Sequence, residues 1–319
     1  MRLLFISYNR IGDAVLSTGL LGHLIERRQG LRIWVACGPQ AVELFQPTPG
    51  VERVIALTKQ PLAGHWLALW RQAGPWRWDL VVDLRASLIA YFLSAGERRV
   101  LRPDRAARHR LQHLGALFGL DPPPRPRLWP TAADGARAAS LLPAGGPILA
   151  LAPGANWGGK VWPAERFAEL VGRLTASGGP LPGARLLLLG APGERAICAR
   201  VAAALPAERV IDIAGRAGLL TAFACLRRVS LFVGNDSAAM HLAATTGQPT
   251  LGLFGPSREE RYGPWGAHGA SVRGERSFRE IVGQPGYDYR RQDSHMLDLS
   301  VDKVEAAARA LLARGRAVE

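Results

Sequence analysis

The sequence predicts an α/β protein built from two doubly wound parallel sheets. Short apolar runs alternate with helical patterns along all 319 residues, which is the order that βαβ units produce. Several runs are apolar on both faces, for example LLLL in the second half, as expected for strands that helices cover on each side. A proline-rich stretch near the middle separates two halves that repeat the same scheme.

The individual elements follow from these runs. In the first half, strands are predicted at 3–7, 32–37, 51–57 and 79–84, with helices at 14–28 and 62–73. In the second half, strands are predicted at 147–153, 184–190, 210–215, 229–234 and 249–255. The segment 256–296 shows no regular pattern, and a last helix is predicted at about 301–314.

The division into domains rests on the stretch DPPPRPRLWP at 121–130. Its prolines lack a backbone donor and break regular structure, so the stretch marks a linker. We expect a first domain at 1–143, with its linker at about 121–146, and a second at 144–319. Two such domains are expected to face a cleft at the carboxyl ends of their strands, where ligands bind in doubly wound sheets.

The composition is 48% hydrophobic and 21% charged, which excludes a disordered tail, a collagen-like repeat and a multispan membrane protein. Lysine and arginine total 40 against 26 acidic residues, giving a net charge of +14. Only Lys59, Lys160 and Lys303 are lysines, and this skew toward arginine, glycine and proline indicates GC-rich codon usage in part. The charge leaves nucleic acid, an anionic membrane surface and a phosphorylated substrate open as partners.

Cysteine spacing and the hydropathy pattern bear on the compartment. Cys37, Cys198 and Cys225 form no C-x-x-C pair, so we expect buried free thiols and no metal site. No uncharged apolar stretch approaches 18 residues, and the first apolar run is too short for a signal peptide. These observations predict a cytoplasmic protein, with attachment to a membrane surface left open.

The first motif is RIGDAVLST at 10–18, directly after a predicted strand. Gly12 permits a tight turn, and Asp13 opens the following helix. Aspartate is a preferred N-cap residue, and the spacing alone favours that structural role. The alternative is a carboxylate that acts as a general base toward a hydroxyl, and one side chain can serve both roles.

The second motif, at 234–257, predicts a strand end followed at once by a helix. Asp236, Ser237 and Ala238 lie at the start of that helix, where unpaired N–H groups and the helix dipole favour an anion. An aspartate beside a phosphate needs another purpose, such as accepting hydrogen bonds from sugar hydroxyls. His241 lies about one turn further on, and a lone helix histidine is more often a packed residue than a ligand.

The third motif, at 151–167, matches G-x-x-x-x-G-K over 154–160 but is not a P-loop. Val161 replaces the magnesium-binding Ser or Thr, and Pro163 makes the helix begin too late. Lys160 is still a candidate ligand for one phosphate oxygen, because its ammonium group is compact and its loop is rich in glycine. The alternative is a solvated lysine.

The fourth motif is LLLLGAPGERA, in which Glu194 lies in the first turn of a predicted helix. A glutamate at this position is explained equally by the helix dipole and by binding of ribose hydroxyls.

Taken in order, these motifs resemble the ADP-heptose:lipopolysaccharide heptosyltransferases, glycosyltransferase family 9. The shared set is RIGDAVLST, K-x-W-P-x-E-R-F, L-x-G-x-P-x-E-R, and D-S-x-x-x-H-L-A-A with a trailing LFGPS, and it covers nearly the whole chain. The resemblance implies the GT-B architecture, with the acceptor bound by the first Rossmann-like domain and the nucleotide-sugar by the second. It also implies inverting, metal-independent transfer from ADP-heptose or a related donor to a lipopolysaccharide-core or similar acceptor, with no cofactor.

The resemblance gives each motif a role. It makes Asp13 the base that deprotonates the acceptor hydroxyl, and Lys160 the cation that neutralises charge on the leaving pyrophosphate. Glu194 would hold the ribose, and Asp236 the donor sugar. The other donor-binding residues are Ser237 and Ala238, whose N–H groups face the phosphates, and His241, which supports that loop. Family members usually have glycine at the position of Ala238, so a positive φ there would strain this chain.

The residues that bind the acceptor are expected in the arginine-rich stretch GERRVLRPDRAARHR at 96–110. This stretch is either a solvated basic face or a patch for the phosphates of an anionic, lipid-linked acceptor at the inner membrane. Its six arginines are Arg98, Arg99, Arg102, Arg105, Arg108 and Arg110. Four tryptophans of the first half either form an aromatic belt at a membrane interface or, as we expect, pack in the core against the sheet. They are Trp66, Trp70, Trp76 and Trp78.

Two other functions compete with sugar transfer. Another GT-B sugar-nucleotide enzyme, such as a 2-epimerase, would need further acid and base residues, and no candidate set stands out. A non-catalytic basic binding protein is the other alternative. No nucleic-acid partner is expected, because no RNP, KH, helix-turn-helix or zinc signature is present and aromatic residues do not interleave with the arginines.

Overall fold

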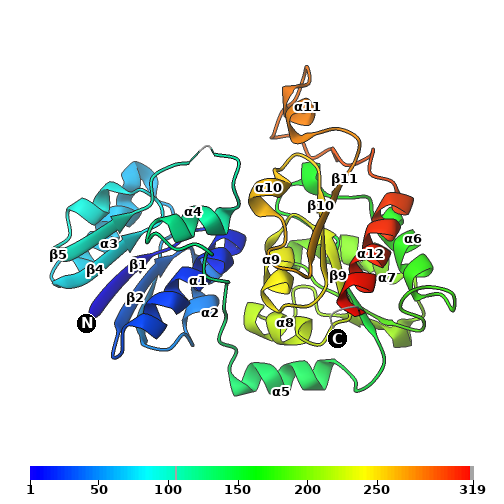
Figure 1. Ribbon diagram of the computed structural model, residues 1–319, viewed down its shortest axis with the longest axis horizontal. Helices are drawn as coiled ribbons and strands as arrows, with labels where there is room; N and C mark the ends of the chain where they lie inside the picture. Colours follow the sequence, from blue (N-terminus) through cyan, green and yellow to red (C-terminus); the bar gives the residue numbers. More distant parts are fainter. Residues whose placement is uncertain (105, 317–319) are drawn as a thin grey trace. The chain divides into compact units, whose positions relative to one another are not determined.

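The computed structural model describes residues 1–104 and 106–316 (Figure 1). It divides into a first unit, Met1–Thr131, and a second unit that begins at Ala132. The division falls inside the predicted linker at 121–146, and the helix α5 (Ala132–Leu141) occupies part of that segment. α5 packs on α8 (Leu219–Leu226) of the second unit, where the Thr221 hydroxyl donates to Asp134 over 2.9 Å.

The first unit holds a parallel sheet of five strands in the order β3-β2-β1-β4-β5. Because β2 and β3 extend the sheet to one side of β1 while β4 and β5 extend it to the other, the connections reverse direction between β1 and β4. The strands are β1 (Arg2–Ile6), β2 (Arg32–Cys37), β3 (Val51–Ala56), β4 (Trp78–Asp83) and β5 (Ala95–Val100). The helices are α1 (Ile11–Arg27), α2 (Val42–Phe45), α3 (Gly64–Ala73) and α4 (Arg110–Ala116), with 3-10 turns η1 (Pro39–Ala41), η2 (Pro61–Ala63) and η3 (Leu88–Tyr91).

The second unit holds a parallel sheet of six strands in the order β11-β10-β9-β6-β7-β8. Its connections reverse direction between β6 and β9. The strands are β6 (Ile148–Ala152), β7 (Arg185–Leu188), β8 (Val210–Asp212), β9 (Leu231–Asn235), β10 (Thr250–Phe254) and β11 (Gly269–Arg273). Besides α5, the helices are α6 (Ala164–Thr175), α7 (Arg195–Ala202), α8 (Leu219–Leu226), α9 (Ala238–Thr245), α10 (Glu259–Tyr262), α11 (Phe278–Gly283) and α12 (Val301–Arg316), with 3-10 turns η4 (Gly158–Lys160), η5 (Pro192–Glu194) and η6 (Ala207–Arg209).

The nine strands predicted from the apolar runs are all present, which confirms the α/β fold class with two doubly wound sheets. The prediction that 256–296 lacks regular structure is wrong, since α10, β11 and α11 lie in it. The strand β5 was not predicted either. Both missed strands form sheet edges and are only partly buried, so their sequences, AGERRV and GASVR, lack the continuous apolar run of a central strand.

Large aromatic side chains contribute to the core of the second unit. In the second unit, Trp162 is fully buried, donates its indole N–H to Leu299 O over 2.9 Å, and meets Phe167 edge to face at 4.9 Å. The three cysteines are buried and unpaired, as expected, and burial raises the pKa of the Cys37 and Cys198 thiols to about 12. Over the described residues, no helix is long and apolar enough to cross a membrane.

Packing in the second unit predicts the effect of removing a leucine. Leu170 on α6 is fully buried, so Leu170→Ala is expected to lower the free energy of unfolding by about 2–5 kcal/mol. Leu297 is 59% exposed, so Leu297→Ala is expected to stay within about 0.5 kcal/mol of the wild type. Urea unfolding of both variants measures the difference. Equal losses would contradict this core.

Candidate functional site

Three of the predicted motifs follow three neighbouring strands of the second sheet. β9, β6 and β7 lie side by side in parallel, so their carboxyl ends meet at one edge. Lys160 follows β6, Glu194 follows β7, and Asp236 follows β9. This edge contains the point between β6 and β9 where the connections reverse, which is the usual ligand-binding position of a doubly wound sheet.

A direct ion pair joins two of these residues. The Lys160 ammonium Nζ lies 2.6 Å from Asp236 Oδ2, and the Asp236 side chain is only 7% exposed. On the other side of the carboxylate, His241 Nε2 lies 3.9 Å from Oδ1. His241 thus lies next to Asp236, on the helix that follows it. A carboxylate this buried is costly without a charged partner, so Lys160 and Asp236 fix each other's position.

Asn235, which the sequence analysis did not single out, connects this edge to the Lys160 loop. Its fully buried side chain donates from Nδ2 to Pro153 O over 2.8 Å, and its Oδ1 accepts a hydrogen bond from the Trp162 backbone N–H over 3.2 Å. One amide thus holds both ends of the loop between β6 and α6. The sequence signal was a polar residue closing the apolar run VSLFVGN.

The loop is also held by a distant segment, 284–296. The Trp157 indole donates to Arg291 O over 2.6 Å, the His295 N–H donates to Gly159 O over 3.0 Å, and the Ser294 hydroxyl donates to Val161 O over 2.6 Å. The ring of His295 lies 5.7 Å from that of Trp157. Burial lowers the pKa of His295, which favours the neutral ring in this aromatic contact. We call these contacts the loop clamp.

Gly158 belongs to the same clamp. Its N–H donates to Gln292 Oε1 over 2.8 Å, and a Cβ at this position would lie 2.2 Å from the Gln292 backbone oxygen. No side chain fits there unless the backbone moves. The glycines read as flexibility in the sequence therefore serve close packing of the clamp.

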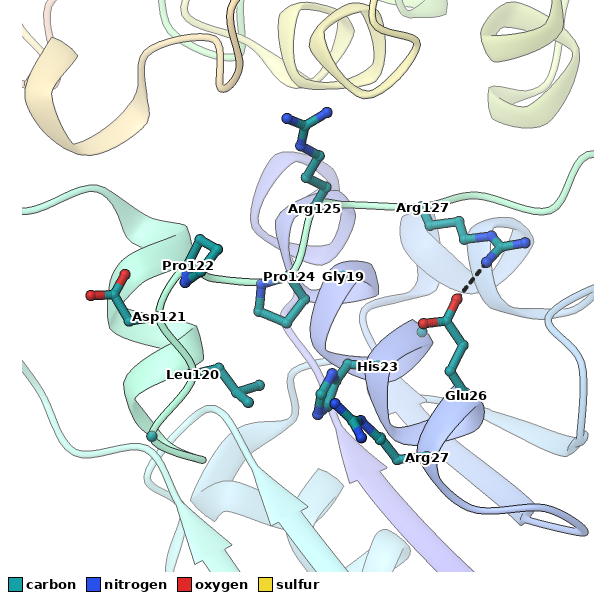
Figure 2. A pocket seen from close by; sticks show the side chains of 12 residues that line it. Gly19, His23, Glu26, Arg27, Leu120, Asp121, Pro122, Pro124, Arg125 and Arg127 are labelled. Atoms are coloured by element: carbon teal, nitrogen blue, oxygen red, sulfur yellow. Dashed lines mark hydrogen bonds and ion pairs between the residues drawn. The ribbon is translucent and has the colours of Figure 1, made fainter.

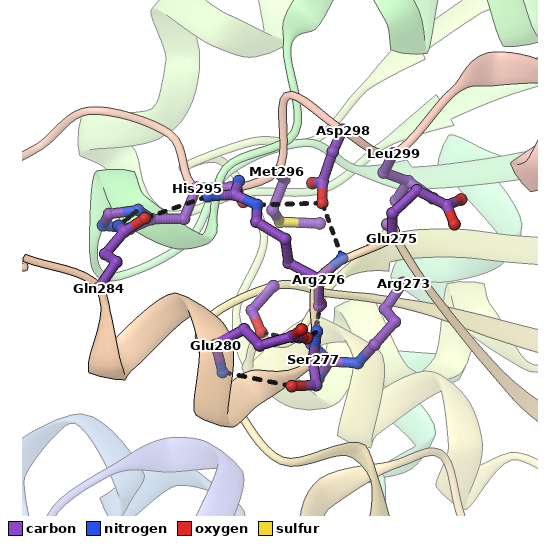
Figure 3. A network of polar contacts seen from close by, with 12 residues as sticks. Arg273, Glu275, Arg276, Ser277, Glu280, Gln284, His295, Met296, Asp298 and Leu299 are labelled. Atoms are coloured by element: carbon purple, nitrogen blue, oxygen red, sulfur yellow. Dashed lines mark hydrogen bonds and ion pairs between the residues drawn. The ribbon is translucent and has the colours of Figure 1, made fainter.

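The clamp segment is in turn held by Arg276 (Figure 3). The Arg276 guanidinium donates to Asp298 Oδ2 over 3.2 Å and to His295 O over 3.1 Å. Although burial opposes it, hydrogen bonding by Arg276 holds the pKa of Asp298 below its usual value, so the pair stays ionic. Arg276 thereby links the start of α12 to the Lys160 loop through His295.

The start of α9 carries an unsatisfied polar group. Ser237 precedes the first helical residue, Ala238, and within the described part of the chain the buried Ser237 Oγ has no hydrogen-bond partner. Ser257, which follows the adjacent strand β10, has a buried hydroxyl in the same condition. Buried hydroxyls in proteins are almost always paired, so the unpaired Ser237 hydroxyl next to Asp236 is a candidate group for binding a ligand.

The expected strain at Ala238 does not arise. The described non-glycine residues with positive φ are Leu62, Ala63 and Ala86, and Ala238 is an ordinary first residue of a helix. An alanine at this position is therefore compatible with the local backbone.

Glu194 lies against the same loop. One of its oxygens, Oε2, accepts a hydrogen bond from the Ala191 N–H over 2.7 Å, which is the local structural role expected beside a helix start. A Cβ on Gly154 would lie 2.3 Å from the Glu194 carboxyl carbon, so the carboxyl group packs directly on the backbone that leaves β6. The structural role is thus realised, and the position next to the loop keeps ribose binding open.

In the first unit, Asp13 follows β1 but does not cap α1. The helix begins at Ile11 with Arg10 at the N-cap position, so the favoured cap role is wrong and Asp13 lies within the first turn. Its Oδ1 lies 3.7 Å from Arg110 Nε, and no hydrogen bond to this oxygen is present among the described residues. The geometry therefore leaves one buried carboxylate oxygen beside a cation and without a hydrogen bond from the described part of the chain.

Arg110 is itself fixed in place. Its guanidinium lies over the Tyr8 ring at 4.8 Å and contacts His113 Nδ1 at 3.0 Å. Because Arg110 donates to Nδ1, His113 carries its proton on Nε2, which lies 2.9 Å from Arg102 O. In the sequence Arg110 is one of several arginines in a basic stretch, and its contact with Asp13 is not predictable from that pattern.

The predicted acceptor arginines make different contacts. Arg98 is committed to backbone carbonyls, donating to Ala90 O over 2.9 Å and to Leu93 O over 2.5 Å. Arg99, the next residue of β5, forms an ion pair with Glu97 at 2.7 Å. Arg102 is exposed, and Arg105 lies outside the described residues.

The four tryptophans are also divided. Trp78 is buried, as expected for core packing, whereas Trp70 is 44% exposed and Trp76 is 38% exposed. Trp66 is half-buried, with the Arg85 guanidinium 4.5 Å above its ring.

A cavity of about 500 Å³ opens in the first unit beside the carboxyl half of α1 (Figure 2). His23 and Arg27 from α1 line it together with Leu120, Asp121 and Pro122. None of the predicted site residues lines this cavity. Across residues 1–104 and 106–316, no cluster of three or more His, Cys, Asp or Glu side chains could hold a metal ion.

The fold defines the class to which this protein belongs. Two parallel-sheet units of this kind make up the GT-B architecture, and solved structures of that class align over nearly the whole chain. Escherichia coli ADP-heptose lipopolysaccharide heptosyltransferase II has a TM-score of 0.77 at 22% identity, covering 99% of this chain and 100% of that one. E. coli heptosyltransferase WaaC with ADP has a TM-score of 0.73 at 18% identity, covering 98% and 100%. At these levels of sequence identity, the structural similarity establishes the fold alone.

The family model for glycosyltransferase family 9 (heptosyltransferase) matches residues 98–281, more than half of the chain, and the chain belongs to that family. Lipopolysaccharide heptosyltransferase 2 of Salmonella typhimurium is 31% identical over 144 residues, which cover 42% of this chain and 40% of that protein. Lipopolysaccharide heptosyltransferase 1 of Pseudomonas aeruginosa is 26% identical over 300 residues, covering 83% and 82%. The matches to the first curated relatives, from Haemophilus influenzae and S. typhimurium, span 32% and 40% of their lengths.

The loop clamp predicts opposite effects for two glycine substitutions. Gly158→Ala must displace Gln292 and is expected to destabilise the second unit by about 1–3 kcal/mol and speed amide exchange in 154–161. Gly172→Ala on α6 meets no atom within 4 Å and is expected to stabilise by about 0.5–1 kcal/mol. Thermal unfolding and hydrogen exchange measure both. Unchanged exchange in Gly158→Ala would contradict the clamp.

Proposed function

We propose that this protein is an inverting glycosyltransferase. In this proposal it moves a heptose or a related sugar from an ADP-sugar to a lipopolysaccharide-core or similar glycan acceptor. The observation that carries the proposal is the buried Lys160–Asp236 pair beside the unpaired Ser237 hydroxyl, at the reversal point of the second sheet. Membership of the family supports the same reaction, as do the relatives, which are heptosyltransferases of lipopolysaccharide or lipooligosaccharide.

The second unit binds the nucleotide-sugar in this proposal. The backbone N–H groups of Ser237 and Ala238 open α9 and suit phosphate oxygens, to which the Ser237 hydroxyl adds a donor. Lys160 supplies the positive charge for the same phosphates. Asp236 accepts hydrogen bonds from sugar hydroxyls, and Lys160 offsets its negative charge beside the phosphates.

Two further residues complete the donor site. Glu194 binds the ribose hydroxyls with the carboxylate oxygen that Ala191 does not occupy. His241 packs behind Asp236 and keeps its carboxylate oriented. Two structures of E. coli WaaC, one with ADP and one with ADP-2-deoxy-2-fluoro heptose, support an adenine nucleotide as the donor.

The first unit supplies the base. Asp13 takes the proton from an acceptor hydroxyl while that oxygen forms a bond to the anomeric carbon. The bond between the anomeric carbon and the phosphate oxygen breaks, its electron pair leaves with ADP, and Lys160 stabilises the growing negative charge. Attack on the face opposite the leaving group inverts the anomeric centre. No metal ion or cofactor takes part in the proposed step.

The acceptor is an anionic or lipid-linked glycan. Arg102, which is exposed, and the neighbouring Arg98 and Arg99 supply positive charge at the edge of the first unit. Peripheral contact with the cytoplasmic face of the inner membrane accompanies a lipid-linked acceptor. Nucleic acid is not a partner in this proposal.

The reaction is tested with a panel of sugar nucleotides, measuring release of free nucleotide in the presence of a lipopolysaccharide core acceptor. ADP-heptose is expected to turn over. Asp13→Asn is expected to reduce turnover by about 10²–10⁴-fold because the base is lost, while ADP still raises the melting temperature. Asp121→Asn, also in the first unit, is the control and should keep wild-type turnover.

Full activity of Asp13→Asn would overturn the base assignment. Conversion of the sugar nucleotide in the absence of any acceptor would instead favour an epimerase. Equal melting-temperature shifts with ADP, UDP and GDP would contradict the donor site.

Removing the Lys160 charge tests the leaving-group role. Lys160→Met is expected to lower kcat by about 10²–10³-fold, because a positioned charge no longer meets the leaving phosphate. Lys160→Arg should not restore it, since the planar guanidinium does not fit the place of a compact ammonium beside Asp236. Lys303→Met, which removes a lysine paired with Glu275, should leave kcat unchanged. Near-normal kcat in Lys160→Met would refute the role.

A further inference from the structure

Two loops of the first unit expose large apolar side chains. They follow β3 and β4, and their exposed residues extend along α3 and η3. Leu62 is fully exposed, Leu88 is 75% exposed and Phe92 is 70% exposed. We call the whole set the apolar rim: Leu62, Leu67, Trp70, Leu88, Tyr91 and Phe92.

The rim is one surface. The Trp70 indole N–H donates to Phe92 O over 3.2 Å, which joins α3 to the end of η3. Beneath this contact, Leu69 from α3 and Ile89 from η3 belong to one buried cluster. Side chains from the two loops are therefore exposed over a shared core.

Hydrogen bonds to a buried carboxylate hold the backbone of the rim in place. Fully buried Asp83 accepts hydrogen bonds from the Arg85 N–H over 2.8 Å and the Ser87 N–H over 2.7 Å, which fixes the turn that leads into η3. Burial raises the pKa of Asp83, and Ser87 opposes that rise by donating to the carboxylate. Leu62 has a φ of 49°, a left-handed conformation that is unfavourable for leucine. Such a backbone conformation persists only where the surrounding structure holds it, and it is enriched at functional sites.

The two chain segments that carry the rim contain basic residues and no acidic ones. The segments 57–78 and 84–96 contain no aspartate or glutamate, and they carry Lys59, Arg71, Arg77 and Arg85. A protein partner would need an apolar patch fringed with acid to match this surface. Basic residues that flank exposed leucine and aromatic side chains are the composition of proteins that lie on an anionic bilayer.

The position of the rim in the sheet fits a membrane-bound acceptor. β4 is paired with β1 in parallel, so the loop that follows β4 lies at the same sheet edge as Asp13, which follows β1. We propose that the apolar rim docks on an anionic lipid bilayer and inserts its leucine and aromatic side chains at the headgroup level. This inference rests on the proposed function for its acceptor, which the same bilayer would hold.

Vesicle flotation of the full chain tests the docking. The protein is expected to float with vesicles of phosphatidylcholine and phosphatidylglycerol, and more weakly with phosphatidylcholine alone or at high salt. Leu88→Ser with Phe92→Ser should weaken binding about tenfold or more, because two apolar side chains no longer enter the bilayer. The matched control is Leu297→Ser with Tyr289→Ser, which removes an exposed leucine and an exposed aromatic residue from the second unit and should bind as the wild type does.

Two further measurements separate this proposal from the proposed function. Rim variants should keep the ADP-induced rise in melting temperature and turnover of a deacylated, water-soluble acceptor, and should lose turnover of an acceptor embedded in vesicles. Rim-dependent flotation without any sugar transfer would retain the docking and reject the function. Absence of flotation by the wild type, or equal flotation of the rim variant, would overturn the docking. So would a dimer that the rim substitutions dissociate without any vesicle binding, since the rim would then cover a second copy.

Discussion

Parallel pairing of every strand is the constraint on which the rest of the structure depends. It directs all carboxyl ends of a sheet to one edge, so residues that follow different strands become neighbours although they lie far apart in the chain. Lys160 and Asp236 are 76 positions apart, yet their charged atoms approach to 2.6 Å. The same pairing places Asp13 and the loop after β4 at one edge of the first sheet.

Holding a lysine against a buried carboxylate requires a rigid loop, because the pair is favourable only at close, fixed geometry. Asn235 fixes the ends of that loop, and the clamp from 284–296 fixes its middle. The glycines of the loop serve this packing, since a side chain at Gly158 would overlap Gln292. The apparent P-loop is therefore a differently held loop, whose helix α6 begins only at Ala164.

The large positive charge is dispersed in the folded protein. Arg173 contacts three carboxylates, Arg273 pairs with Glu259, and Arg276 holds Asp298, so these arginines link elements within the second unit. In the first unit, Arg98 and Arg99 are bound locally, and Arg110 orients Asp13. What distinguishes the first unit is the absence of acid around its apolar rim rather than the total charge.

The sequence by itself determined the α/β class, the nine inner and flanking strands with strong apolar runs, and the four motifs, because burial on both faces of a parallel strand leaves a local pattern. Edge strands β5 and β11 left none, since most of their residues are exposed or only partly buried. Only the tertiary structure decided that Arg110 meets Asp13, that Asn235 and the clamp hold Lys160, and that Leu88 and Phe92 are exposed. These facts depend on contacts between residues distant in the chain, for which local periodicity and spacing carry no information.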